Sequence, residues 1–288
     1  MGSIESANPI VSAFPSSKHR CRIEGRCVRQ VIYARSMQDS CLLDQLMANA
    51  WPPLETEYLG ATRLRWASGF TRRANSCLPV GTDEQIEEIF EGAKAFYTAR
   101  KEGPIFLLST ASAPPSMESE LREMGFEATA HTVMQVARSD GVATPEFRDR
   151  QWVVETSDEP GDAWFKTYWD VESTRDRNEL QRTVCRSILR GSGRATYVSV
   201  LESGETVAVG QVVVEGGWAG VQCMATHPLW RRRGAAAVVL GCLAERAVEL
   251  GAENMYLAVM QSNAGARKLY EEVGFSTVHE YCYLARPA

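Results

Sequence analysis

The 288-residue sequence lacks the patterns that mark several classes of protein. It has no apolar run long enough to span a membrane, and no basic segment followed by an apolar one at its N-terminus. None of its eight cysteines forms a C-x-x-C pair or stands at ligand spacing from a histidine, as zinc motifs require. We therefore expect a cytoplasmic protein with no structural disulfides and no bound metal.

The sequence also lacks an excess of basic residues, with 31 lysines and arginines against 36 aspartates and glutamates. The net charge is −5 and the pI is about 5.6, whereas nucleic-acid-binding domains are usually basic, so nucleic acid is not the expected partner. The apolar content of 44% and the charged content of 23% are typical of globular proteins. The length suits one large domain or two of ordinary size, and the polar residues 1–20 are typical of a flexible tail.

A short pattern occurs twice, about half a chain apart. "LREMGF" covers residues 121–126 and "LYEEVGF" covers residues 269–275. Each stands in a strand, turn, helix and strand pattern, and Gly125 and Gly274 can adopt the left-handed conformation of a helix C-cap. The repeat predicts two α/β domains, 21–140 and 150–288, joined by a linker at 141–149.

The expected elements are similar in both halves. In the first half, strands over 61–70 and 72–80 precede a helix over 83–101. In the second half, strands over 195–203, 205–217 and 218–228 are separated by turns at Ser203-Gly204 and Gly216-Gly217. A helix over 234–250 follows them.

Two motifs of the second half point to a known family. Arg231-Arg232-Arg233-Gly234-Ala235-Ala236 fits the pattern Q/R-x-x-G-x-G/A, and Asn263 precedes a helix that carries Tyr270 just before a Gly-Phe pair. In this order, the motifs resemble those of the GNAT acyltransferases, which move an acyl group from acyl-coenzyme A to an amine. The resemblance implies two tandem GNAT-like domains, each a mixed, mostly antiparallel sheet flanked by helices.

The resemblance also implies acetyl-coenzyme A, or another acyl-coenzyme A, as co-substrate. A loop that opens a helix presents unpaired N–H groups and the positive end of the helix dipole, where pyrophosphate binds. Gly234 lets the backbone approach closely, and the arginines add charge-assisted hydrogen bonds. The preceding strand splays from its neighbour in the family and binds the pantetheine arm. The implied donor-binding residues are Met224, Ala225, Thr226, Arg231, Arg232, Arg233, Gly234, Ala235, Ala236, Asn263, Ala266 and Tyr270.

Three residues have candidate roles in the chemistry. The family assigns the position of Tyr270 to the general acid, and a phenol of pKa about 10 can protonate a thiolate of pKa about 8.5 beside it. Packing alone is the alternative for Tyr270, and helix capping is the alternative for Asn263. Glu215, at the end of a central strand, is the candidate general base, although a solvent-facing hairpin residue explains it more simply.

The first half is expected to have lost the chemistry. Alignment of the Gly-Phe pairs places Leu121 at the position of Tyr270, and the loop "CLPVGTDEQ" is acidic where phosphate would bind. The predicted roles are structural support, a wall of the acceptor pocket or a separate binding site. Its strands carry Arg63, Arg65, Arg72 and Arg73, which fit either a charged ligand or a solvated strand face.

The acceptor is expected to be a small, cationic amine. The helix after the linker carries Trp164, Tyr168, Trp169, Asp170 and Glu172, and aromatic and carboxylate side chains suit a cation. The same residues also suit an amphipathic helix packed on a sheet. Two alternatives stay open, a transferase that uses an aminoacyl-tRNA donor and a non-catalytic ligand-binding protein. The sequence makes no prediction of the oligomeric state.

Overall fold

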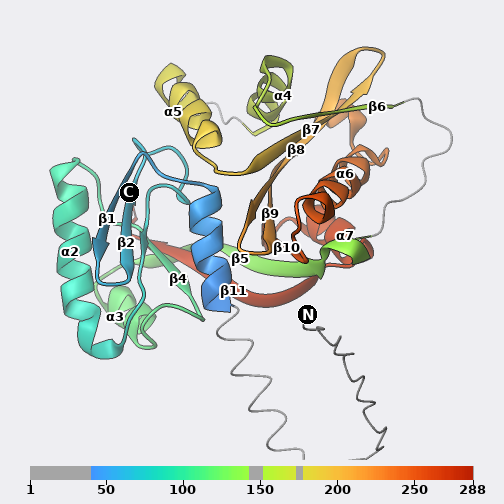
Figure 1. Ribbon diagram of the computed structural model, residues 1–288. Helices are drawn as coiled ribbons and strands as arrows, with labels where there is room; N and C mark the ends of the chain where they lie inside the picture. The colour runs from blue at the N-terminus through green and yellow to red at the C-terminus, as the bar shows by residue number, and fades with distance from the viewer. Residues whose placement is uncertain (1–39, 143–151, 173–177, 288) are drawn as a thin grey trace, which may run out of the picture. The chain divides into compact units, whose positions relative to one another are not determined.

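The computed structural model describes residues 40–142, 152–172 and 178–287, which belong to one compact unit, Ser36–Ala288. The predicted tail, residues 1–20, and most of the predicted linker lie outside the described residues. Within the described part, eleven strands form one sheet with helices packed against it (Figure 1). The predicted mixed, mostly antiparallel α/β fold is confirmed. The described residues contain no helix that is long and apolar enough to cross a membrane.

The first half begins with helical residues 40–50. The elements that follow are β1 (Glu55–Leu59), β2 (Thr62–Trp66), β3 (Cys77–Leu78), η1 (Asp83–Gln85), α2 (Ile86–Ala99), β4 (Phe106–Ser109), α3 (Met117–Glu123), β5 (Glu127–Arg138) and η2 (Ser139–Gly141). The strand predicted over 72–80 is wrong, because only Cys77–Leu78 pairs as a strand. Residues 67–76 form a loop, in which the Asn75 side chain bonds to the backbone of four other residues.

The second half follows the predicted order closely. Its elements are β6 (Val153–Ser157), α4 (Asp162–Glu172), α5 (Glu179–Arg190), β7 (Ala195–Glu202), β8 (Glu205–Glu215), β9 (Trp218–Thr226), η3 (Pro228–Trp230), α6 (Ala235–Glu249), β10 (Asn254–Met260), α7 (Ala264–Glu272) and β11 (Ser276–Ala285). Both predicted hairpin turns are confirmed, since their two central residues have positive φ angles, as tight hairpins require.

The two halves exchange their last strands. The sheet order is β1-β2-β3-β4-β11-β5-β10-β9-β8-β7-β6. β4 of the first half pairs with β11 of the second, and β10 of the second half pairs with β5 of the first. β5 and β11 also pair with each other at the middle of the sheet, where Figure 1 draws them in green and red. The strands of both halves therefore form a single sheet. The predicted domain boundaries stay predictions.

The repeated helix ends have the same hydrogen bonding. Gly125 has a φ angle of 86° and Gly274 one of 109°, both in the left-handed region. The N–H of Phe126 donates to the carbonyl of Leu121 at 3.0 Å, and the N–H of Phe275 donates to that of Tyr270 at 2.9 Å. These bonds are those of a Schellman C-cap, which supports the predicted equivalence of Leu121 and Tyr270.

Helices cover both faces of the second half's strands. Val212 and Val221 pack in a cluster with α6, whereas Val209 and Cys223 pack in a cluster with α4 and α5. The side chains of Val221 and Cys223 face opposite sides because β9 has a bulge here, marked by a φ angle of 53° at Cys223 and a register shift against β8. Trp51, Ala67 and Phe70 of the first half join the α4 and α5 cluster, so the halves share an apolar core.

Candidate active site

The site lies where β9 and β10 part. These strands pair in parallel from Asn254 and Trp218 to Leu257 and Val221, and the pairing ends there. β9 continues to Thr226 and β10 to Met260 without pairing to each other. Their separation leaves backbone groups of both strands free, and two adjoining cavities lie beside it. The splay implied by the family resemblance is therefore present.

The first cavity, which we call the loop cavity, has a volume of about 640 Å³. It is bordered by the end of β9, the loop before α6 and the first turns of α6 and α7. Every predicted donor-binding residue lines it except Arg233, whose guanidinium lies over the Trp230 ring, 4.8 Å from the ring centroid. The lining residues that were predicted are Met224, Ala225, Thr226, Arg231, Arg232, Gly234, Ala235, Ala236, Asn263, Ala266 and Tyr270.

The start of α6 presents open backbone donors to the loop cavity. Gly234 is the N-cap residue with a φ angle of 92°, and no side chain caps the helix. In the described part of the chain, the backbone N–H groups of residues 232–236 have no hydrogen-bond acceptor. The φ angle of Arg232 is also positive, at 58°, which favours a concave row of N–H groups. Together with the helix dipole, this row forms a site for an anion.

The first turn of α7 lies on the same cavity. Asn263 is its N-cap, and the Asn263 Oδ1 atom accepts a hydrogen bond from the N–H of Ala266 at 3.1 Å. The predicted alternative of a capping role for Asn263 is therefore confirmed. Tyr270 lies two turns further along the same helix face and is 8% exposed. Burial raises the pKa of Tyr270 to about 12, and the nearby Glu172 carboxylate contributes, so the phenol keeps its proton at neutral pH.

The second cavity, which we call the gap cavity, has a volume of about 460 Å³ and lies between the separated strands. Both halves line it. The first half contributes Thr71, Arg72, Arg73, Ala130 and Thr132, and the end of β11 contributes Tyr281 and Tyr283. Five residues border both cavities, so the two spaces adjoin: Glu172, Met224, Asn263, Ala266 and Tyr270.

Sequence reasoning missed several residues of the gap cavity, namely Thr132, Gln222, Tyr281 and Tyr283. Thr132 reaches the cavity because β5 of the first half pairs with β10 of the second, and no local pattern in the sequence signals this exchange of strands. Arg72 and Arg73 stand out in the sequence as part of an arginine-rich stretch. The two strand patterns around them gave no sign that a loop carries both into the site.

The predicted general base, Glu215, is not at the site. It lies at the hairpin between β8 and β9, at the opposite end of these strands from Met224–Thr226, and lines neither cavity. Its carboxylate accepts hydrogen bonds from the Asn49 Nδ2 atom at 2.9 and 3.1 Å. The position of Glu215 therefore does not support the predicted role as general base. Among the described residues that line the gap cavity, Glu172 is the one carboxylate.

The aromatic residues of α4 are mostly part of the core. Trp164 is 3% exposed, and its Nε1 atom donates to the carbonyls of Val198 and Gly210. Tyr168 is buried but reaches the gap cavity, and Asp170 pairs with Lys166 at the surface. Packing therefore accounts for Trp164, while Tyr168 and Glu172 face the cavity from positions one turn apart.

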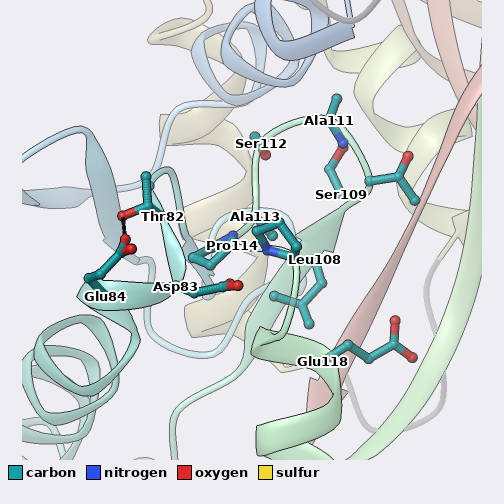
Figure 2. Close-up of a pocket in the computed structure, with 13 residues that line it drawn as sticks. Thr82, Asp83, Glu84, Leu108, Ser109, Ala111, Ser112, Ala113, Pro114 and Glu118 are labelled. Atoms are coloured by element: carbon teal, nitrogen blue, oxygen red, sulfur yellow. Dashed lines mark hydrogen bonds between the residues drawn. The ribbon is translucent and has the colours of Figure 1, made fainter.

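The first half has a cavity at the equivalent place, with a volume of about 680 Å³ (Figure 2). It lies between the loop before η1, the end of β4 and the start of α3. At its helix start, the N–H of Thr82 donates to the Gln85 Oε1 atom at 3.1 Å, and the Thr82 hydroxyl bonds to Glu84. Asp83, Glu84 and Glu118 border it. This cavity therefore has carboxylates where the loop cavity has open N–H groups and arginines.

The described residues contain no group of three or more histidine, cysteine, aspartate or glutamate side chains that is able to hold a metal ion. The two cavities are lined by backbone N–H groups, phenols, carboxylates and arginines. Open N–H groups at a helix start beside a splayed strand end suit a ligand that has both a pyrophosphate and an extended amide-bearing arm.

Solved structures share this fold. The chain is similar to a GCN5-related N-acetyltransferase from Kribbella flavida, with 17% identity and a TM-score of 0.64, over 88% of this chain and 96% of that one. It is also similar to a tandem GNAT protein from the clavulanic acid biosynthesis pathway, with 13% identity and a TM-score of 0.60, over 91% and 94% of the two chains. The fold is that of the GNAT superfamily, as predicted.

Sequence matches identify the family within that superfamily. Residues 41–284 match the family described as "Probable histone acetyltransferase Rv0428c C-terminal", and the chain belongs to this family. The chain is also similar to the "Uncharacterized N-acetyltransferase YobR" of Bacillus subtilis (strain 168). The two are 26% identical over 253 residues, which cover 86% of this chain and 98% of that protein.

Proposed function

We propose that this protein transfers an acyl group, acetyl in the simplest case, from acyl-coenzyme A directly to an amine. One observation carries the proposal: the residues of both sequence motifs, apart from Arg233, line a single cavity that contains an uncapped helix start. The names of the family and of YobR, both acetyltransferases, agree with this reaction.

The loop cavity is the proposed donor site. The N–H groups of residues 232–236 would bind the pyrophosphate, and the arginines at 231 and 232 would add charge-assisted bonds. The Arg231 Nε atom donates to the carbonyl of Thr226 at 3.2 Å and so ties the loop to the strand end. The backbone of Met224–Thr226 pairs with β8 on one side only, which leaves its other edge for the pantetheine arm.

Tyr270 and Glu172 are placed to handle the protons. Tyr270 borders both cavities and holds its proton at neutral pH, so it would protonate the departing coenzyme A thiolate. Glu172 borders the same two cavities and, when ionised, would attract the acceptor's ammonium group. It would accept the amine's proton directly or through a water molecule.

The protonation of the Cys223 thiol supports direct transfer of the acyl group, without an acyl-enzyme intermediate. This thiol is the one thiol among the cavity-lining residues that the structure describes. Burial raises the pKa of Cys223 well above its usual value, although the Arg73 guanidinium acts in the opposite direction. A thiol that keeps its proton is a poor nucleophile, so an acyl-enzyme on Cys223 is not part of the proposal.

A donor and acceptor screen tests the proposed function. The purified protein is incubated with acetyl-coenzyme A and a panel of amines, and free thiol and acetylated amine are measured. We expect thiol release that depends on the amine. Binding of acetyl-coenzyme A without transfer to any amine would favour the non-catalytic alternative. Transfer from an aminoacyl-tRNA but not from acetyl-coenzyme A would favour the tRNA-dependent one.

A further inference from the structure

The gap cavity carries a positive charge that the proposed reaction does not use. Resting on the proposed function, we propose that the acceptor is a small amine that also bears a carboxylate, and that Arg73 binds this carboxylate. The predicted cationic acceptor then becomes a zwitterion, with its ammonium group toward Glu172 and its carboxylate toward the first half of the chain.

Arg73 lies half-buried in the gap cavity with no acidic partner in the described part of the chain. Its guanidinium stacks over the Trp51 ring, 4.5 Å from the centroid, and its Nη1 atom donates to the Gln222 Oε1 atom at 3.0 Å. Its other N–H groups have no acceptor among the described residues. Removing a charge from water is costly unless it is paired, and a guanidinium matches the planar fork of a carboxylate.

The loop that holds Arg73 is rigidly tied. The Oδ1 atom of Asn75 accepts from the N–H groups of Ala67 and Gly69 at 2.8 and 3.0 Å. The Nδ2 atom of Asn75 donates to the carbonyls of Phe70 and Thr71 at 2.8 and 2.9 Å. Asn75 itself is 3% exposed. A guanidinium held in place before the ligand arrives loses little freedom on binding, which favours affinity.

A second donor lies beside Arg73. Gln222 is 6% exposed, and its buried Nε2 atom has no hydrogen-bond partner among the residues described. Its Oε1 atom already accepts from Arg73, so the amide nitrogen is the group left for a ligand. An unpaired buried N–H donor and an unpaired guanidinium are both satisfied by the same ligand feature, a carboxylate oxygen.

Two of the charged side chains that line the gap cavity, Arg73 and Glu172, affect the pKa of one tyrosine. Burial raises the pKa of the Tyr168 hydroxyl well above its usual value; among nearby charges, Arg73 lowers this pKa and Glu172 raises it. Both charges therefore lie near Tyr168. Glu172 also borders the loop cavity and Arg73 does not. This arrangement orients an amino acid-like acceptor, with its amine toward the donor and its carboxylate away from it.

The test uses pairs of acceptors, one with and one without this carboxylate. Each of the twenty common amino acids is compared with its carboxamide, with acetyl-coenzyme A as donor and kcat/KM as the readout. We expect the accepted amino acids to exceed their amides by about tenfold or more, as loss of a charged hydrogen bond would cause. In Arg73→Gln, this preference should fall to near one, because the rate with the amino acids falls much more than the rate with the amides.

Two further variants control the result. Arg122→Gln also removes one positive charge from the first half, but Arg122 pairs with Glu118 on α3 and lines neither the loop cavity nor the gap cavity, so it should keep the preference. Arg73→Lys keeps the charge and loses the planar fork, so it should keep part of the preference. Unchanged affinity for acetyl-coenzyme A in Arg73→Gln shows that the variant is folded.

The outcomes separate the inference from the proposed function. Amides that react as well as amino acids, or a preference that persists in Arg73→Gln, would overturn the role of Arg73 while leaving the transferase intact. Acetylation of amines without a carboxylate, and of no amino acid, would do the same. Failure to bind acetyl-coenzyme A would instead overturn the proposed function.

Discussion

The two halves of the molecule start equivalent helices in opposite ways. In the second half, α6 begins at Gly234 without a side-chain cap, and its open N–H groups face the loop cavity beside Arg231 and Arg232. In the first half, the side chain of Gln85 bonds back to the N–H of Thr82. The acidic residues Asp83 and Glu84 follow Thr82, and Figure 2 shows the bond between Thr82 and Glu84. A capped, acidic helix start stabilises its own helix but repels phosphate.

The two halves share a fold but contribute different residues to the site. The second half carries the groups that suit an acyl donor, and the first half carries Leu121, which is 1% exposed, at the position of Tyr270. The first half still shapes the site, because its loop brings Arg73 and its last strand brings Thr132 into the gap cavity. The exchange of β5 and β11 makes this sharing possible.

The largest effect is expected when the halves are separated. A chain of residues 150–288 alone would lack β5, which lies between β10 and β11, so both strands would expose an unpaired edge. It would also lose Trp51, Ala67 and Phe70 from the α4 and α5 core. We expect an insoluble or inactive protein. A soluble fragment that acetylates the same acceptor at the full rate would show that the halves are independent.

Replacing the tyrosine that distinguishes the second half should have the next largest effect. Tyr270→Phe removes one oxygen and leaves the buried ring, so it tests chemistry more than packing. Loss of a general acid typically lowers the rate by about 10²–10⁴-fold, and we expect at least about tenfold in kcat with little change in donor affinity. Tyr58→Phe, at a site 66% exposed on β1, is the matched control. A near wild-type rate in single-turnover measurements would make Tyr270 a packing residue.

The smallest expected effect concerns the pH dependence of kcat. Ionisation of Tyr270 should cause no fall in kcat near pH 10. The folded-state pKa of Tyr270 is raised to about 12, chiefly by burial, so the phenol stays protonated well above pH 10. The raised pKa also contributes to the free energy of unfolding. This contribution is complete below the unfolded-state pKa of about 10 and is lost as the pH rises through about 12. Any fall in the wild-type kcat near pH 10 should therefore also occur in Tyr270→Phe, because Tyr270 does not ionise there. A fall that disappears in Tyr270→Phe would mean that the phenol ionises near its ordinary pKa.

Local patterns predicted much of this structure. The hairpins at Ser203-Gly204 and Gly216-Gly217 and the Gly-Phe helix ends follow from backbone conformations that few residues adopt. The donor residues follow from two motifs that have their own local geometry. Predictions from the sequence were incorrect where contacts between distant residues determine the structure. Residues 72–80 form mostly a loop around Asn75, and Glu215 lies at the end of β8 that is far from the two cavities. The strand exchange has no local signature at all.

Calorimetric titration with acetyl-coenzyme A tests the central claim most directly, because the claim is that only the second half binds the donor. We expect one site for each chain. Gly234→Val should weaken it by about tenfold or more, since a side chain there is strained at a φ angle of 92° and obstructs the N–H groups. Gly204→Val, at a hairpin turn with a φ angle of 83°, controls for strain and should keep the affinity. Two sites for each chain, or one site that Gly234→Val leaves unchanged, would contradict the account.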